Sequence, residues 1–254
     1  DIVTYEPVQD RIDFVCQLAA NWAGLSQLST ANRCIAIVLA NYPNRDGRIG
    51  NGVGLDTSQG IITALRAMKA AGYDTGEIPI DGDGLIARLA AGPTNQGLKG
   101  KICETLSLAN YQSFFVALPM QVQQAVCGRW GVPETDPMFI ADKLGGGYFA
   151  VSAFQLGKVA ICLQPARGYN IDPKSSYHDP DLVPPHGYLA FYCWLRTEFG
   201  ADAVIHFGKH GNLEWLPGKS LGLSDQCFPE ITLGPLPHFY PFIVNDPGEA
   251  ATAK

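Results

Sequence analysis

Apolar residues along this chain alternate between helical spacing and short unbroken runs, which is the pattern of an α/β protein. Within residues 8–28, Ile12, Val15 and Trp22 recur at the spacing of one helix face. Residues 34–40 form a continuous apolar run, typical of a parallel strand buried on both faces. The chain is therefore predicted to open with an amphipathic helix followed by a central strand.

A glycine-rich loop at residues 44–56 follows this strand. Asp56 or Thr57 is expected to cap the next helix, which Gly72 closes. Strand, loop and helix together form the opening of a βαβ unit. The loop matches neither nucleotide-binding fingerprint, and Asp56 at the helix start would repel a phosphate, so a tight turn is favoured over a nucleotide site.

The middle of the chain is predicted to contain short elements. Three short helices are expected at residues 85–91, 111–118 and 120–129. Two strands are expected at 148–154 and 159–163, and the residues between them predict a tight hairpin turn.

The last part of the chain returns to longer elements. The loop at 164–185 is long enough to suggest a functional segment. A helix at 186–199 begins after two prolines and is apolar nearly all round, so it is expected to be buried, and a strand at 203–207 follows it.

These elements predict an α/β fold with a mostly parallel sheet flanked by helices and a short antiparallel hairpin addition. We expect a segment at 1–100 that carries the glycine-rich loop and a segment at 101–254 that carries the histidines, unless the two form one compact unit.

Composition narrows the class of protein. A net charge of -6 without a basic block argues against nucleic acid or an anionic membrane as partner. Seven dispersed cysteines without a Cys-x-x-Cys pair indicate reduced thiols and a cytoplasmic location. No membrane span or signal peptide is evident, and the start at Asp1 suggests a piece of a longer protein.

Three residues spaced four apart carry the strongest chemical signal: His206, His210 and Glu214. Imidazole and carboxylate bind divalent metals or transfer protons. Gly208 and Gly211 disfavour one continuous helix, so His206 is placed at a strand end, His210 in the following loop and Glu214 in a short helix. The alternative for His206 is a buried core histidine with satisfied hydrogen bonds.

Other side chains are weaker candidates. His186 begins the buried helix, where the helix terminus favours a neutral imidazole, although an ordinary surface histidine is equally consistent. Arg167, in the loop after a strand, offers a cation to a substrate carboxylate, or it simply stabilises that loop. His178 and His238 carry only weak signals. Several aromatic residues could stack on a flat ligand or belong to the core: Tyr177, Tyr188, Tyr192, Trp194 and Trp215.

The run at 208–219, which reads Gly-Lys-His-Gly-Asn-Leu-Glu-Trp-Leu-Pro-Gly-Lys, resembles the signature of the large subunit of aerobic cobaltochelatase, the CobN type. The resemblance extends over the whole chain, through residues 44–57, 164–173, 177–178, 181–194 and 233–249, with Ser58 in place of an expected proline. The H subunit of magnesium chelatase shares the His-Gly-x-x-Glu core, whereas Lys209, Asn212 and Trp215 favour the cobalt type.

The resemblance implies ATP-dependent insertion of Co²⁺, the substrate metal, into the corrin precursor hydrogenobyrinic acid a,c-diamide in cobalamin biosynthesis. It implies companion cobaltochelatase subunits, one an AAA+ ATPase, that hold ATP and Mg²⁺. His210 and Glu214 are then expected to be catalytic, with His186, His206, His210 and Glu214 as metal ligands. The implied substrate-binding residues are Arg167, Tyr169, Lys209, Asn212 and Trp215.

Two other functions stay open. One is a subunit of the magnesium-chelatase H type, which inserts Mg²⁺ into protoporphyrin IX. The other is a non-catalytic module that binds a tetrapyrrole or a partner protein. Because the family's large subunit is several times longer, a piece of this size is not expected to insert cobalt alone.

Overall fold

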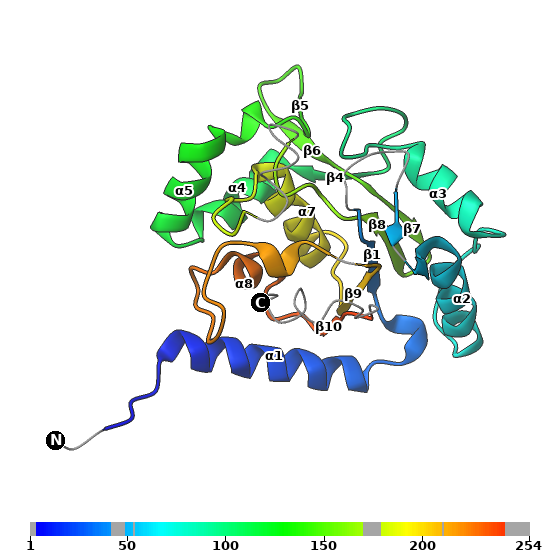
Figure 1. Ribbon diagram of the computed structural model, residues 1–254, viewed down its shortest axis with the longest axis horizontal. Coiled ribbons are helices and arrows are strands. Elements are labelled where there is room, and N and C mark those ends of the chain that lie inside the picture. Colours follow the sequence, from blue (N-terminus) through cyan, green and yellow to red (C-terminus); the bar gives the residue numbers. More distant parts are fainter. Residues whose placement is uncertain (1–3, 42–48, 53, 170–178, 210, 242–254) are drawn as a thin grey trace.

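A five-stranded sheet forms the centre of the structure, a computed structural model in which residues 4–41, 49–52, 54–169, 179–209 and 211–241 are described (Figure 1). Its strand order is β10-β9-β1-β8-β7. The pairs among β10, β9, β1 and β8 are parallel, and β7 joins β8 as an antiparallel edge strand. The strands are β1 (Ile35–Leu39), β7 (Ala153–Leu156), β8 (Val159–Leu163), β9 (Ala203–Phe207) and β10 (His238–Phe239). The predicted mostly parallel sheet with a hairpin addition is confirmed.

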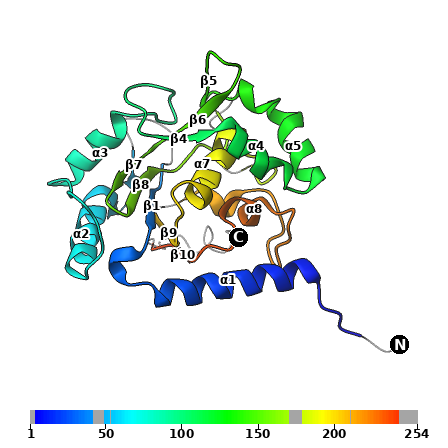
Figure 2. The same ribbon diagram turned by 180° about the vertical axis from the view of Figure 1, so that it is seen from behind.

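Helices cover both faces of this sheet (Figures 1 and 2). Alternate residues of β1 point to opposite sides: Ile35, Ile37 and Leu39 pack in the core that α2 and α3 complete, and Ala36 and Val38 in the core built around α7. The helices are α1 (Gln9–Gln27), α2 (Thr57–Ala70), α3 (Gly82–Ala90), α4 (Leu108–Val116), α5 (Met120–Trp130), α7 (His186–Thr197) and α8 (Phe228–Leu233). Short 3₁₀ turns are η1 (Thr30–Asn32), η3 (Pro133–Thr135) and η4 (Leu213–Trp215).

A separate antiparallel sheet of three strands lies beside α4 and α7, in the order β4-β6-β5. Its strands are β4 (Glu104–Ser107), β5 (Phe139–Ala141) and β6 (Gly147–Val151). The predicted strand at 148–154 is therefore wrong as one unit: it divides at Ser152, and its two halves, β6 and β7, belong to different sheets. In the glycine-rich loop, β2 (Asn51–Gly52) and β3 (Leu55–Asp56) form a minimal hairpin.

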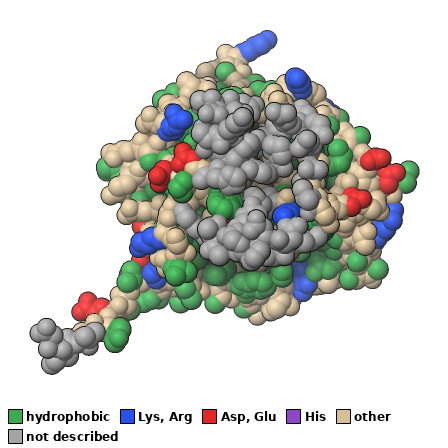
Figure 3. Space-filling model, in the orientation of Figure 1, with side chains coloured by type: hydrophobic (Ala, Val, Ile, Leu, Met, Phe, Trp, Pro, Cys, Tyr) green, Lys and Arg blue, Asp and Glu red, His purple; other side chains and the backbone are tan. Residues whose placement is uncertain are grey.

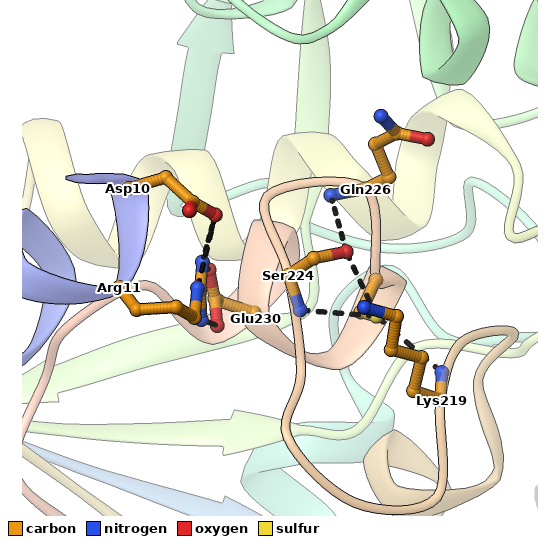
Figure 4. A network of polar contacts seen from close by, with 7 residues as sticks. Asp10, Arg11, Lys219, Ser224, Gln226 and Glu230 are labelled. Atoms are coloured by element: carbon orange, nitrogen blue, oxygen red, sulfur yellow. Dashed lines mark hydrogen bonds and ion pairs between the residues drawn. The ribbon is translucent and has the colours of Figure 1, made fainter. Parts of the chain in front are cut away.

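The first helix, α1, lies along one edge of the molecule, with α8 and β10 beside it (Figures 1 and 2). None of its residues is buried, and hydrophobic side chains gather along this edge of the surface (Figure 3). Arg11 makes two hydrogen bonds of 2.5 Å to the carboxylate of Glu230 on α8 (Figure 4). Asn21 donates a hydrogen bond of 2.8 Å to the backbone oxygen of Pro235. These contacts tie α1 to the C-terminal part of the described chain.

The central sheet draws on both predicted segments. β1, from the segment at 1–100, lies between β8 and β9, from the segment at 101–254. The boundary near residue 100 stays a prediction.

Candidate functional site

The carboxyl ends of β1, β8 and β9 lie at the same edge of the central sheet. Leu39 is in register with both Leu163 and Phe207, the last residues of the neighbouring strands. Ligands of open α/β sheets bind at such an edge, beyond the ends of the strands. The loops that follow β8 and β9 carry most of the residues singled out from the sequence.

The turn after β9 depends on a glycine. Gly208 has a φ of +140°, and a Cβ there would lie 2.5 Å from the Cβ of Ala40. Only glycine lets this backbone pass so close to the end of β1. Gly52 of the glycine-rich loop makes a similar approach, since its Cβ would lie 3.3 Å from the backbone nitrogen of Lys209. The loop therefore packs against the turn that leads toward Glu214.

His206 is buried within a chain of hydrogen-bonded rings. Its Nδ1 lies 2.7 Å from Nε2 of His238, and its Nε2 lies 2.9 Å from the hydroxyl of Tyr192. Burial, helped by the neighbouring His238, lowers the pKa of His206 to about 3. The imidazole is therefore neutral at neutral pH, and both of its ring nitrogens are occupied. This is the core histidine that the sequence left open as the alternative.

His186 is fully buried at the first position of α7, away from these rings. The hydroxyl of Tyr111 donates to its Nδ1 at 2.6 Å, and its Nε2 donates to the backbone oxygen of Gly131 at 3.0 Å. Burial lowers the pKa of His186, as expected for a neutral imidazole, though desolvation is the main cause. Its partners come from α4 and the end of α5, so the structure does not bring it to Glu214. The assignment of His186 as a metal ligand has no geometric support.

Glu214 lies in η4 and is held by a tyrosine from the far end of the described chain. The hydroxyl of Tyr240 donates to Oε1 of Glu214 at 2.8 Å and also accepts a hydrogen bond from the backbone N–H of Gly211. Burial and the Glu214 carboxylate raise the pKa of Tyr240, so the phenol keeps its proton. Tyr240 thereby fixes the carboxylate beside the turn that follows Gly208.

Glu214, His238 and Tyr240 line one part of a cavity of about 450 Å³. The helix α1 contributes Phe14, Leu18 and Trp22 to the lining. The rest of the lining comes from η4 and from residues in and near α8: Leu213, Leu223, Pro229, Glu230, Leu233, Gly234 and Leu236. Its size and its mainly apolar lining with a few convergent polar groups are those of a small-molecule site.

The remaining predicted residues divide between this neighbourhood and a more distant one. Asn212 accepts a hydrogen bond of 2.7 Å from Tyr188 and donates one of 3.0 Å to the backbone oxygen of Pro165, which joins the loops after β8 and β9. Arg167 is buried and donates to the backbone oxygen of Asp179. Burial lowers its pKa, an effect that Tyr188, Asp179 and Glu214 partly offset.

Tyr169 lies elsewhere, because its hydroxyl donates to Asp136 at 2.7 Å and its ring packs on Trp130. Lys209 and Trp215 are half-buried beside Glu214 in sequence. His210, Tyr177 and His178 lie outside the described residues. Within the described part of the chain, no group of three or more His, Cys, Asp and Glu side chains could hold a metal ion.

Sequence reasoning gave His238 only a weak signal and missed Tyr240. The two residues lie two apart, at the spacing that places side chains on one face of a strand, and their rings stack with centroids 5.9 Å apart. That alternation is the signal that could have found them.

Comparison with known proteins identifies the family. The model of the family CobN/Magnesium Chelatase matches residues 1–254. The chain belongs to the CobN/magnesium chelatase family. It is 58% identical to the aerobic cobaltochelatase subunit CobN of a Sinorhizobium species and 52% identical to that of Pseudomonas aeruginosa, in each case over 100% of this chain and 20% of the relative. It is 32% identical to the H subunit of the magnesium chelatase of Rhodobacter capsulatus, over 98% of this chain and 20% of that protein.

A solved structure supports the fold of this family member. The catalytic subunit of cobaltochelatase from Mycobacterium tuberculosis superposes with a TM-score of 0.86 and 40% sequence identity, covering 98% of this chain and 21% of that one. The chain thus spans about a fifth of the length of the relatives it matches. Among the helices described, none is both long and apolar enough to cross a membrane.

Proposed function

We propose that this chain is a substrate- and metal-binding part of the large subunit of an aerobic cobaltochelatase. The complete subunit would insert Co²⁺ into hydrogenobyrinic acid a,c-diamide in cobalamin biosynthesis, as a ligase that forms cobalt–nitrogen bonds. The observation that carries the proposal is the identity of 58% and 52% to CobN subunits, against 32% to the H subunit of a magnesium chelatase, over nearly the same residues.

The geometry of the cavity supports this chemistry. Insertion into a tetrapyrrole requires loss of the ring N–H protons and of water from the metal ion. A carboxylate can accept a proton or complete the metal's coordination, and neutral imidazole can hold the ion while it loses water. Glu214 lines the cavity described above, and a hydrogen bond from Tyr240 positions its carboxylate. The macrocycle would lie between this polar lining and the apolar side chains of α1.

The proposal gives each of the other predicted site residues a role toward the metal or the tetrapyrrole. His210 would act with Glu214 on the metal or the ring protons, and His206 would support them from its buried position in the core. Arg167 would meet a peripheral carboxylate of the substrate, because it is a buried cation within electrostatic reach of Glu214. Lys209, Asn212 and Trp215 flank Glu214 in sequence and would contact the substrate. Tyr169 has the weakest support, since its hydroxyl is bonded to Asp136.

The partners belong to the same proposal. ATP and Mg²⁺ would be held by companion cobaltochelatase subunits, one of AAA+ type, in the cytoplasm. Because this chain spans only about a fifth of its relatives, activity would require the complete large subunit together with these companions.

An absorbance titration tests the choice of substrate. The complete large subunit is titrated with hydrogenobyrinic acid a,c-diamide and, separately, with protoporphyrin IX. We expect the corrin precursor to bind at least tenfold more tightly, a difference of about 1.4 kcal/mol. Tighter binding of protoporphyrin would favour the magnesium branch instead. Binding of either ring without cobalt insertion, even with companions and ATP, would indicate a non-catalytic module.

A further inference from the structure

Two imidazoles, those of His206 and His238, contact the ring of Tyr240, which holds Glu214, and they differ in what they offer a ligand. His206 is 2% exposed and has both ring nitrogens hydrogen-bonded. His238 is only partly buried and is one of the residues that line the cavity. Its Nε2 is bonded to His206, and among the described residues its Nδ1 makes no hydrogen bond.

We propose that His238 is the imidazole that this site presents to the incoming divalent metal ion, and that His206 is the residue that positions it. This inference rests on the proposed function, because the metal is the one to be inserted into the tetrapyrrole. It moves the ligand role from His206, the strand-end histidine, to a residue 32 positions later in the chain.

The hydrogen-bonded chain behind His238 fits this role. When Nε2 of His238 donates to Nδ1 of His206, Nε2 of His206 is left to donate to the hydroxyl of Tyr192. Nδ1 of His238 then carries the lone pair that a metal needs. A metal-ligating histidine is commonly held in this way, with its second nitrogen donating to a buried partner that sets its tautomer and orientation.

Glu214 supplies the matching carboxylate. The ring of Tyr240 stacks on that of His238, and its hydroxyl donates to Glu214, so one short segment positions both groups at the same cavity. The described residues provide one imidazole and one carboxylate there, and they form no cluster of three or more metal ligands. Two protein ligands leave coordination positions for water and for ring nitrogens, as a metal that must be passed on requires.

Co²⁺ binding to the complete large subunit tests the assignment without depending on turnover. Isothermal titration with CoCl₂ compares the unaltered protein with H238A and H206A. We expect H238A, which removes the ligand, to weaken Co²⁺ binding at this site at least a hundredfold. H206A keeps the ligand and removes only the partner that orients it, so it should weaken binding less, by about tenfold.

Two further measurements keep the outcome decisive. The far-ultraviolet circular dichroism and the urea unfolding transition of H238A should match those of the unaltered protein, which shows that the variant is folded. Added imidazole should restore Co²⁺ binding to H238G, as a purely structural residue would not allow.

The assignment is overturned if H238A binds Co²⁺ as the unaltered protein does, or if H206A alone abolishes binding. It is also overturned if the unaltered protein has no measurable Co²⁺ site, so that H238A has none to remove. Failure of the proposed function would give a different result: the unaltered subunit would not bind the corrin precursor.

Discussion

At the scale of single residues, three buried or half-buried histidines have different surroundings. His186 is held between Tyr111 and the backbone of Gly131, in the core of the α4 and α7 packing. His206 is enclosed between Tyr192 and His238, and only His238 reaches the cavity. Their shared feature is a lowered pKa caused by burial.

This burial predicts a pH dependence of stability. In the unfolded chain His206 gains a proton near pH 6.5, whereas in the folded protein it does so only near pH 3. Between these values the unfolded state binds more protons, so the free energy of unfolding falls as the pH is lowered from 6.5 toward 3. From pH 7 to pH 4.5 the loss from this residue is on the order of 3 kcal/mol.

Urea unfolding at pH 7 and pH 4.5 measures this loss. The variant H206Q, which has no titrating ring, should lose clearly less stability over the same interval than the unaltered chain. His186 and His238 act in the same direction, so some loss remains in the variant. An equal loss in both proteins would show that His206 is not held neutral in the folded state.

At the scale of elements, the hydrophobic pattern predicted the long segments well. The helix at 8–28, the strand at 34–40 and the strand at 203–207 correspond to α1, β1 and β9 within a residue or two. Each has enough apolar residues to show its period, and each is bounded by glycine, proline or a polar turn.

The short elements could not be predicted for a physical reason. β4, β5 and β10 have four, three and two residues, too few to show a period. β4 and β10 are stabilised by pairing with strands distant in sequence, β6 and β9, whereas β5 pairs with β6, the next strand along the chain. β10 exists because His238 and Phe239 pair with Val204 and Ile205 of β9. The same pairing brings His238 beside His206, so the missed site residue and the missed strand have one cause.

The candidate site was therefore only partly predictable. The sequence correctly places the loop with Glu214 beyond a strand end, because glycines and the apolar run before them are local signals. It could not show that Tyr240 holds Glu214 or that His186 belongs to the core, because those contacts join residues 26 and 75 positions apart.

The α1 helix provides a prediction at this scale. Trp22 lines the cavity and packs edge-on against Phe239 of β10, at a centroid distance of 5.3 Å. If the tetrapyrrole lies in this cavity, W22A in the complete subunit should weaken its binding about tenfold through loss of apolar contact. Absorbance titration measures the change.

Val15 offers a matched control on the same helix. It is 60% exposed and does not line the cavity, so V15A should leave tetrapyrrole binding unchanged. Equal affinities of W22A and V15A would place the ring elsewhere.

At the scale of the whole molecule, residues far apart in the sequence meet on one side of the central sheet. α1 from the start of the chain, η4 after β9, and α8 and β10 near the end surround the cavity. The Arg11–Glu230 ion pair links the first of these to the others (Figure 4). The parallel sheet provides the rigid frame on which the carboxylate and the imidazole are held.

The most direct test is cobalt insertion by the complete large subunit, with its companion subunits and ATP, when Glu214 is replaced by Gln. The substitution keeps the side chain's size and removes its charge and its basicity. We expect E214Q to lower insertion at least a hundredfold while tetrapyrrole binding stays within about twofold, consistent with loss of a general base. E134Q, at an exposed glutamate of η3, should insert cobalt normally. Unaltered turnover by E214Q would contradict a role for this carboxylate in the chemistry.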